Sequence, residues 1–262
     1  MFILIPLEFF ILKKKYPENF DKKDTFSNII IFILPFFIKK FSYLINWLWF
    51  TNIYYFVYAV GLKASPEILT LPWIFVLFLG QDFMFYWFHR TSHHVRWFWA
   101  SHITHHSSKY LNLSTALRHN ILSPLIGLWI FWLPLSFLGF SLAQIELTVF
   151  LNITYQFFVH TPCVKNMPNW VNAIFCTPSH HRVHHGTNEK YLNKNFGSVL
   201  IIWDRFFGTF QKEEERPIYG VLKPVNFKNI YHANFDEYLN LIKDLFRKKS
   251  LKSFINTFIK IN

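Results

Sequence analysis

Four apolar segments of about bilayer length constrain the fold of this 262-residue chain more than any other feature. A helix needs about 20 consecutive, mostly apolar residues to cross the hydrocarbon core of a membrane. The segments that meet this requirement are 41–60, 68–88, 121–138 and 142–159. Short connections join the first to the second and the third to the fourth. The sequence therefore predicts an all-α integral membrane protein, one domain over residues 1–262, with about four transmembrane helices in two hairpins.

The composition favours a membrane as the main partner of the chain. Hydrophobic residues make up 52% of the sequence, and 33 residues are Phe. The net charge of +12 alone admits either nucleic acid or a membrane surface. Because the apolar segments favour the membrane, we expect no nucleic-acid partner. Two cysteines, Cys163 and Cys176, provide neither a disulfide framework nor a Cys-rich zinc pattern.

The distribution of positive charge predicts an orientation in the membrane. With four spanning helices, residues 1–40, 89–120 and 160–262 lie on one face. Of the 27 Lys and Arg residues, Lys63 alone falls on the other face. Cytoplasmic loops are the ones enriched in Lys and Arg. The sequence thus predicts a multi-pass protein of the bacterial inner membrane or the endoplasmic reticulum, with a helical cap on the cytoplasmic face.

Histidines are concentrated in this predicted cap, where the pattern H-x-x-H-H occurs twice and is preceded by a pair at i and i+4. Side chains three or four residues apart share one face of a helix and can bind one metal ion together. Imidazole is the commonest protein metal ligand. Eight imidazoles are too many for one ion, so the count predicts two metals. The candidate ligands are His89, His93, His102, His105, His106, His181, His184 and His185.

His160 is the ninth candidate ligand, at the end of the fourth apolar segment. Asn152, Gln156 and His160 follow one another at i+4 spacing on one side of a helix. Polar residues in a membrane helix normally face the bundle interior or a cavity. The alternative is that Asn152 and Gln156 form interhelical hydrogen bonds and His160 is an interface residue.

Other polar residues are expected next to the ligands. His94 and His180 adjoin ligands but point about 100° away on a helix, so they are predicted to surround the site. Asp82 and Asp204 could orient ligand imidazoles, or could instead cap helices or form ion pairs. His119 is expected to be an ordinary interface residue.

The C-terminal segment 234–262 is basic and amphipathic. Two readings of it remain open: a solvated helix packed on the domain, and an interfacial helix held by anionic lipid.

The histidine segments resemble the fatty acid hydroxylase and sterol desaturase superfamily of membrane di-iron enzymes. The resemblance covers residues 82–224. It is carried by DFMFYWFHRTSH (82–93), WASHITHHSS (99–108), TALR (115–118), TPSHHRVHHG (177–186), NFG (195–197), IIWDRFFGTF (201–210) and YG (219–220). Within the superfamily, the segment 177–186 is especially similar to alkylglycerol monooxygenases and their bacterial relatives. Those enzymes carry Glu where this chain has His94.

The resemblance implies a lipid oxygenase that uses O2 to hydroxylate or desaturate an aliphatic C–H bond. It implies two iron ions on the eight motif histidines, with His160 as a further ligand and with Gln156 and Asn195 beside the site. Electrons would come from tetrahydrobiopterin or from a separate donor. Two other classes remain as alternatives: a membrane zinc-dependent hydrolase and a metal-binding transporter.

Overall fold

The computed structural model describes residues 3–46, 50–66, 70–222, 229–248 and 250–259. In these ranges the chain is helical without strands, apart from the isolated bridges Phe175–Leu200 and Gly186–Tyr219. The prediction of an all-α fold is therefore confirmed. The α-helices are α1 (Leu4–Lys15), α2 (Lys22–Asn46), α3 (Asn52–Val60), α4 (Leu71–His94), α5 (Arg96–His106), α6 (Leu133–Phe137), α7 (Leu142–Val159), α8 (Asn169–Ile174), α9 (Pro178–His184), α10 (Ile202–Phe206), α11 (Ile230–Phe246) and α12 (Leu251–Ile259).

Helices α4 and α7 are long and apolar enough to cross a membrane, and no other helix of the described ranges passes this test. They match the predicted segments 68–88 and 142–159, although residues 68 and 69 lie outside the described ranges. Large apolar side chains are exposed along both helices, such as Phe75 on α4 and Phe150 on α7. An extended apolar surface of this kind is unusual on a soluble monomer and suits contact with lipid.

The prediction of one continuous helix over residues 121–138 is wrong. The segment instead forms short 3₁₀ turns at Ser123–Leu125 and Leu128–Trp132, followed by the five residues of α6. Pro124 and Pro134 lack the N–H that an α-helix needs, and Gly127 adopts a φ of 86°. These residues explain why an apolar segment of sufficient length does not become a spanning helix.

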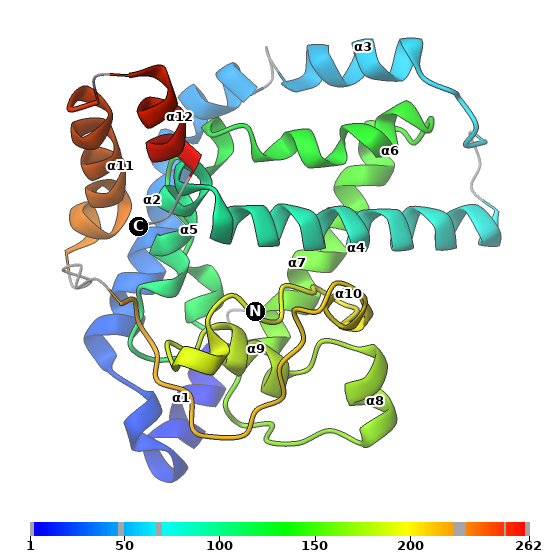
Figure 1. Cartoon of the computed structure of the whole chain (residues 1–262). Helices are drawn as coiled ribbons and strands as arrows, with labels where there is room; N and C mark the ends of the chain where they lie inside the picture. The colour runs from blue at the N-terminus through cyan, green and yellow to red at the C-terminus, as the bar shows by residue number, and fades with distance from the viewer. Residues whose placement is uncertain (1–2, 47–49, 67–69, 223–228, 249, 260–262) are drawn as a thin grey trace.

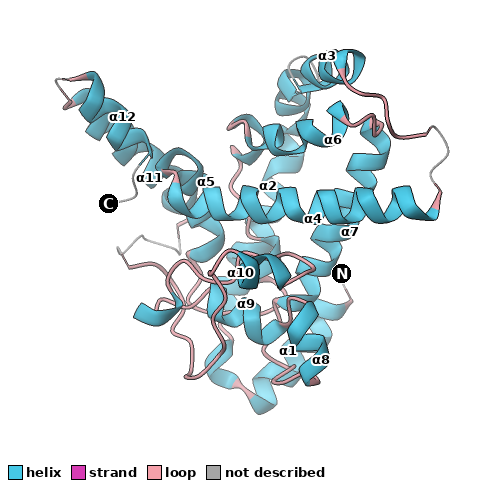
Figure 2. Ribbon diagram, turned by 45° about the vertical axis from the view of Figure 1, so that its right-hand side comes forward, coloured by secondary structure: helices cyan, strands magenta, loops and turns pink. Residues whose placement is uncertain are grey.

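The first predicted span, 41–60, is also divided between two helices. Helix α2 ends at Asn46 and α3 begins at Asn52, while residues 47–49 lie outside the described ranges. In Figures 1 and 2, α3 and α6 lie on one side of α4, and α8, α9 and α10 lie on the other. Helix α7 crosses α4 steeply (Figure 1). The predicted arrangement of four spanning helices in two hairpins is therefore not confirmed.

A tight turn at Gly139 connects α6 to α7. Gly139 adopts a φ of 101°, and a Cβ there would lie 2.8 Å from the Cα of Lys63. Only glycine adopts this conformation readily, so the close approach of the two segments depends on it. Ser141 then begins α7 with a capping box that includes Gln144. The buried side chains of Tyr54, Leu77, Leu135, Phe140 and Ile145 join α3, α4, α6 and α7 in one core cluster.

Helix α11 of the basic tail packs on α5. Arg96 of α5 forms ion pairs with Glu237 and Asp244, at 2.9 and 2.8 Å. The Thr104 hydroxyl donates to the Ala233 carbonyl at 2.7 Å. The tail thus includes a helix docked on the domain, while α12 leaves apolar side chains such as Phe254 exposed.

Helix α1 is attached to the rest of the chain through a buried carboxyl group. Glu8 accepts a hydrogen bond from the Leu113 backbone N–H at 2.7 Å and one from the Thr161 hydroxyl at 2.5 Å. Burial raises the pKa of Glu8 to about 7, and the two hydrogen bonds partly oppose that rise. The native protein therefore favours the neutral carboxyl group over a pH range in which an unfolded chain ionises it.

This raised pKa predicts a pH dependence of stability. Because the native state retains the Glu8 proton and the unfolded state releases it above pH 4.5, stability falls as pH rises toward 7, by about 3 kcal/mol in total. Glu8→Gln should remove this part of the slope, since its amide can accept from Leu113 and donate to Thr161. Thermal unfolding in detergent between pH 4.5 and 8 measures the effect, with the exposed Glu18→Gln as control. Equal slopes for Glu8→Gln and the unsubstituted protein would contradict this origin.

Candidate metal centre

Nine histidines converge in two groups whose ring nitrogens are close enough to share metal ions. Within each group, the candidate ligand atoms all lie within 4.8 Å of one another. The first group contains His89, His93, His102, His106 and His184; the second contains His105, His160, His181 and His185. The two groups are adjacent, because the rings of His106 and His185 stack with their centroids 4.3 Å apart. The structure thus brings together all nine predicted ligands, including His160.

Each H-x-x-H-H motif is divided between the two groups, which corrects the expectation that its three histidines serve one metal. On α5, His102 and His106 belong to the first group and His105 to the second. On α9 and the residue after it the division is reversed: His184 belongs to the first group, and His181 and His185 to the second. Side chains at i and i+4 lie about 40° apart around a helix, whereas the one at i+3 lies on the other side of position i. Where α5 and α9 face each other, the pair of histidines from one helix therefore joins the single histidine from the other, and this happens once in each group.

Backbone carbonyls fix the orientation of three of these rings. The Nδ1 atoms of His89, His160 and His184 lie 2.9, 2.6 and 3.0 Å from the carbonyl oxygens of Phe196, Gln156 and Lys194, respectively. A carbonyl accepts only from a protonated nitrogen, so in the neutral ring the Nε2 atom keeps its lone pair. The Nε2 atom of each of these three rings faces the Nε2 atom of another histidine in the same group. This is the usual way in which a protein presents imidazole to a metal.

The protonation states of the groups also suit a metal. Burial lowers the pKa of His102, His106 and His181 well below the ordinary value, and neighbouring imidazoles lower it further. These rings are therefore neutral near pH 7. Unpartnered buried ring nitrogens remain at His93 Nε2, His105 Nδ1 and His181 Nδ1. A buried polar atom without a partner is costly, and a metal bound in the first group would give His93 Nε2 the partner that the protein does not supply.

Two buried carboxylates hold the segment 196–200 against the histidine groups. Asp82 on α4 accepts from the backbone N–H groups of Val199 and Leu200 and from Trp203 Nε1, at 2.9, 3.2 and 2.8 Å. Asp204 on α10 accepts from the backbone N–H groups of Phe196 and Gly197, both at 2.7 Å. Neither carboxylate contacts a ligand ring. They act on the ligands through Phe196, whose carbonyl orients His89.

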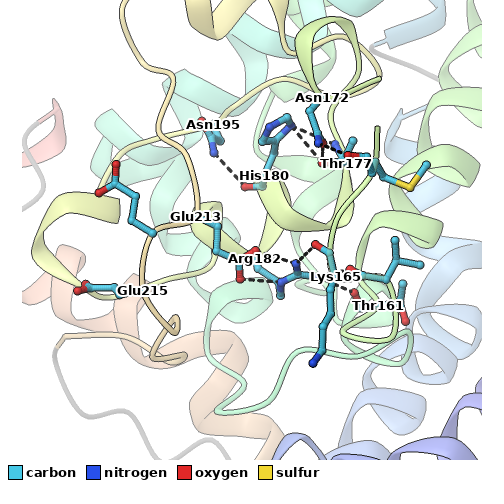
Figure 3. Close-up of polar contacts among 12 residues, drawn as sticks. Thr161, Lys165, Asn172, Thr177, His180, Arg182, Asn195, Glu213 and Glu215 are labelled. Atoms are coloured by element: carbon cyan, nitrogen blue, oxygen red, sulfur yellow. Dashed lines mark hydrogen bonds and ion pairs between the residues drawn. The ribbon is translucent and has the colours of Figure 1, made fainter. Parts of the chain in front are cut away.

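The surroundings of α9 are fastened by an arginine (Figure 3). Arg182 forms a bidentate ion pair with Glu213, at 2.8 and 2.7 Å. The same guanidinium donates to the carbonyls of Val164 and Lys165, at 2.7 and 2.8 Å. One buried side chain therefore connects α9 to the segments on both sides of it, which positions His181, His184 and His185. Arg182 lies inside the second H-x-x-H-H motif, but the histidine spacing gives no signal of this role.

Asn195 and His180 form hydrogen bonds with the backbone around α9 (Figure 3). His180 Nδ1 lies 3.3 Å from the Thr177 backbone nitrogen at the start of α9, so the ring caps the helix. Asn195 donates to the His180 carbonyl at 3.1 Å and to the Gln211 carbonyl at 2.7 Å. His180 thus caps the N-terminus of α9, and Asn195 connects α9 to the backbone of Gln211.

Gln156 and His94 lie beside the groups. The side-chain amide of Gln156 donates to the Ser198 carbonyl at 2.6 Å. The backbone carbonyl of Gln156 faces His160 Nδ1. The exposed ring of His94 packs against Phe196 with the centroids 5.7 Å apart.

A cavity of about 650 Å³ opens onto both histidine groups. His89 and His102 of the first group line it, as do His105, His160 and His181 of the second. Its remaining wall is largely apolar and is formed by Phe50, Phe85, Phe88, Ala116, Pro124, Leu128, Trp129, Trp132, Val149, Ile153 and Phe157. This volume lies within the range that small-molecule sites occupy in proteins.

His119 also lines the cavity, so the expectation of an ordinary interface residue is wrong. Its ring is exposed and lies parallel to that of His105, with the centroids 5.6 Å apart. No short motif links His119 to the ligands; its position follows from how segment 118–120 folds onto α5.

The sequence comparisons agree with this geometry. The family model for fatty acid hydroxylase matches residues 74–209, and the chain belongs to that family. It is 48% identical to human alkylglycerol monooxygenase over 157 residues, which are 59% of this chain and 34% of that protein. It is 43% identical to the Danio rerio alkylglycerol monooxygenase over 172 residues, which are 64% of this chain and 38% of that one.

More distant relatives act on other lipids. The ornithine lipid hydroxylase OlsE of Rhizobium tropici is 31% identical over 144 residues, or 53% of this chain and 43% of that one. The chain spans about a third of the length of the alkylglycerol monooxygenases it matches. No solved structure matches.

The role of Asp82 predicts a graded effect of substitution. Asp82→Leu leaves one buried and two partly buried N–H donors without an acceptor and should lower the free energy of unfolding by about 3 kcal/mol. Asp82→Asn keeps one acceptor oxygen and should cost less. Thermal unfolding in detergent measures both, and Glu18→Leu on the surface is the control. An unchanged stability of Asp82→Leu would show that segment 196–200 is held by other contacts.

Proposed function

We propose that this protein is an integral membrane lipid monooxygenase that binds two iron ions on its nine histidines and oxidises an aliphatic C–H bond with O2. The observation that carries the proposal is an apolar cavity opening directly onto two adjacent imidazole groups. Family membership and the identity to alkylglycerol monooxygenases support it. An alkylglycerol-like ether lipid is the first substrate to test, and acyl lipids and sterols are the alternatives.

The types of side chain in the two groups suit iron that takes part in a reaction better than a metal with a purely structural role. The groups offer five and four imidazoles and no thiolate. Such nitrogen-rich sites suit iron and also accept zinc. Two bound iron ions would supply the O2 activation that cleavage of an unactivated C–H bond requires. The chain itself contributes the apolar wall, which excludes water and holds an alkyl chain beside both groups.

The two exposed apolar helices support a membrane location for the substrate site. We propose that the histidine groups lie at the cytoplasmic face. The segments that carry the histidines, 89–120 and 160–262, also hold most of the Lys and Arg residues of the chain, and such enrichment is typical of cytoplasmic segments. Electrons come from a separate donor or from tetrahydrobiopterin in this proposal.

Isotope labelling tests the oxidation. Cells that express the protein should accumulate a lipid heavier by one oxygen atom, or one lacking two hydrogens. The added oxygen should come from labelled O2 and not from labelled water. Lipid mass spectrometry with and without the protein measures this, and His184→Ala is the inactive control. A product that takes its oxygen from water would instead indicate a hydrolase.

Metal analysis tests the two groups. The unsubstituted protein should hold about two irons per chain when purified from iron-supplied cells. His184→Ala should weaken the metal of the first group and His181→Ala that of the second, each by about tenfold or more in a chelator competition, since even outer contacts to a metal carry that effect. His232→Ala is the matched control, because that histidine pairs with Asp236 away from the groups. Equal metal retention in all variants would remove these histidines from the site.

A further inference from the structure

His119 is held rigidly where it meets the cavity. The residue before it, Arg118, is fully buried and donates to the Thr104 carbonyl at 2.8 Å and to the Ser107 hydroxyl at 2.9 Å. The residue after it, Asn120, donates to the Thr104 hydroxyl at 2.9 Å. Both neighbours are thus fastened to α5, the helix that carries His102, His105 and His106. His119 is therefore fixed relative to the metal groups.

The ring of His119 offers an acceptor to the cavity. A neutral imidazole has one N–H donor and one nitrogen that carries a lone pair. The ring is exposed, and the cavity that it lines is the space in front of it.

Four other polar side chains that line the cavity have protein partners. Ser101 and Ser123 share a hydrogen bond of 2.7 Å. Asn120 and Gln156 are bonded to protein groups through their amides. The carboxylate of Glu146 also lines the cavity. His119 adds an imidazole acceptor that is stacked on His105 of the second histidine group.

We propose that His119 is a substrate-positioning residue, which accepts a hydrogen bond from a hydroxyl group in the head of the lipid. The proposal rests on the cavity being the lipid site. The His119 ring stacks on the ring of His105, which belongs to the second histidine group. A hydroxyl bound to His119 would therefore lie close to that group. The carbons next to the head group would then lie nearest the metals, and the alkyl chain would extend along the apolar wall toward Val149 and Ile153. His119 would thereby select the position of oxidation as well as the lipid.

The same geometry predicts discrimination between lipids of equal chain length. An ether or ester oxygen cannot donate a hydrogen bond to His119, whereas a free hydroxyl can. A site built to pair with a substrate hydroxyl rejects an analogue in which that hydroxyl is blocked. The protein should therefore prefer a lipid with free hydroxyls to its O-methylated counterpart by roughly tenfold or more.

The test compares hexadecylglycerol with its di-O-methyl derivative. Oxidation is measured as kcat/KM for the iron-loaded protein, and binding is measured on the metal-free protein by fluorescence, since Trp129 and Trp132 line the cavity. His119→Leu should bring the ratio between the two lipids to about one in both measurements. His119→Gln, which keeps an acceptor, should restore most of the preference. His232→Leu is the matched control for loss of a histidine outside the cavity.

The outcomes separate this proposal from the proposed function. If the unsubstituted protein and His119→Leu prefer the hydroxylated lipid equally, His119 does not position the substrate. If His119→Leu also loses metal and His119→Gln restores the metal without the preference, the residue is structural and the proposal is wrong. If no lipid is oxidised by the unsubstituted protein, the oxygenase function fails, and the binding ratio still decides the role of His119.

Discussion

The structure depends above all on hydrogen bonds between backbone carbonyls and the Nδ1–H groups of buried histidines. These bonds decide which nitrogen of His89, His160 and His184 faces inward. Two of the three carbonyls belong to the segment 194–196, which has no regular secondary structure to hold it. Asp82 and Asp204 hold the segment that begins at Phe196, by accepting its backbone N–H groups. The burial of two carboxylates, costly in itself, thus serves to orient imidazoles that the carboxylates never touch.

The nine histidines that converge could be predicted because the pattern that marks them is local in sequence. Side chains at i, i+3 and i+4 identify themselves by spacing, and the stripe of Asn152, Gln156 and His160 identified the last of them. The division of each motif between two groups could not be predicted. It depends on how α5 and α9 face each other, and the spacing within one helix does not determine that.

The prediction of the membrane helices from the sequence succeeded only in part, for a similar reason. Hydropathy found α4 and α7, which are long and apolar enough to cross a membrane. It failed at residues 121–138, because it measures the transfer of side chains and ignores the backbone. Pro124, Gly127 and Pro134 change the path of the main chain while hardly lowering the apolarity of the segment. His119 was missed for a related reason, since its place in the cavity follows from the buried contacts of its two neighbours.

The exchange of ligands between α5 and α9 has a consequence for how the protein matures. Neither helix alone offers either group more than two of its imidazoles, and the two motifs are separated by more than seventy residues of chain. If these groups bind metal as proposed, an ion that meets the chain during synthesis would find only partial sites and would be held weakly. Both groups would be completed only when α9 docks against α5. Metal loading would then be a late step of assembly that links two distant parts of the polypeptide.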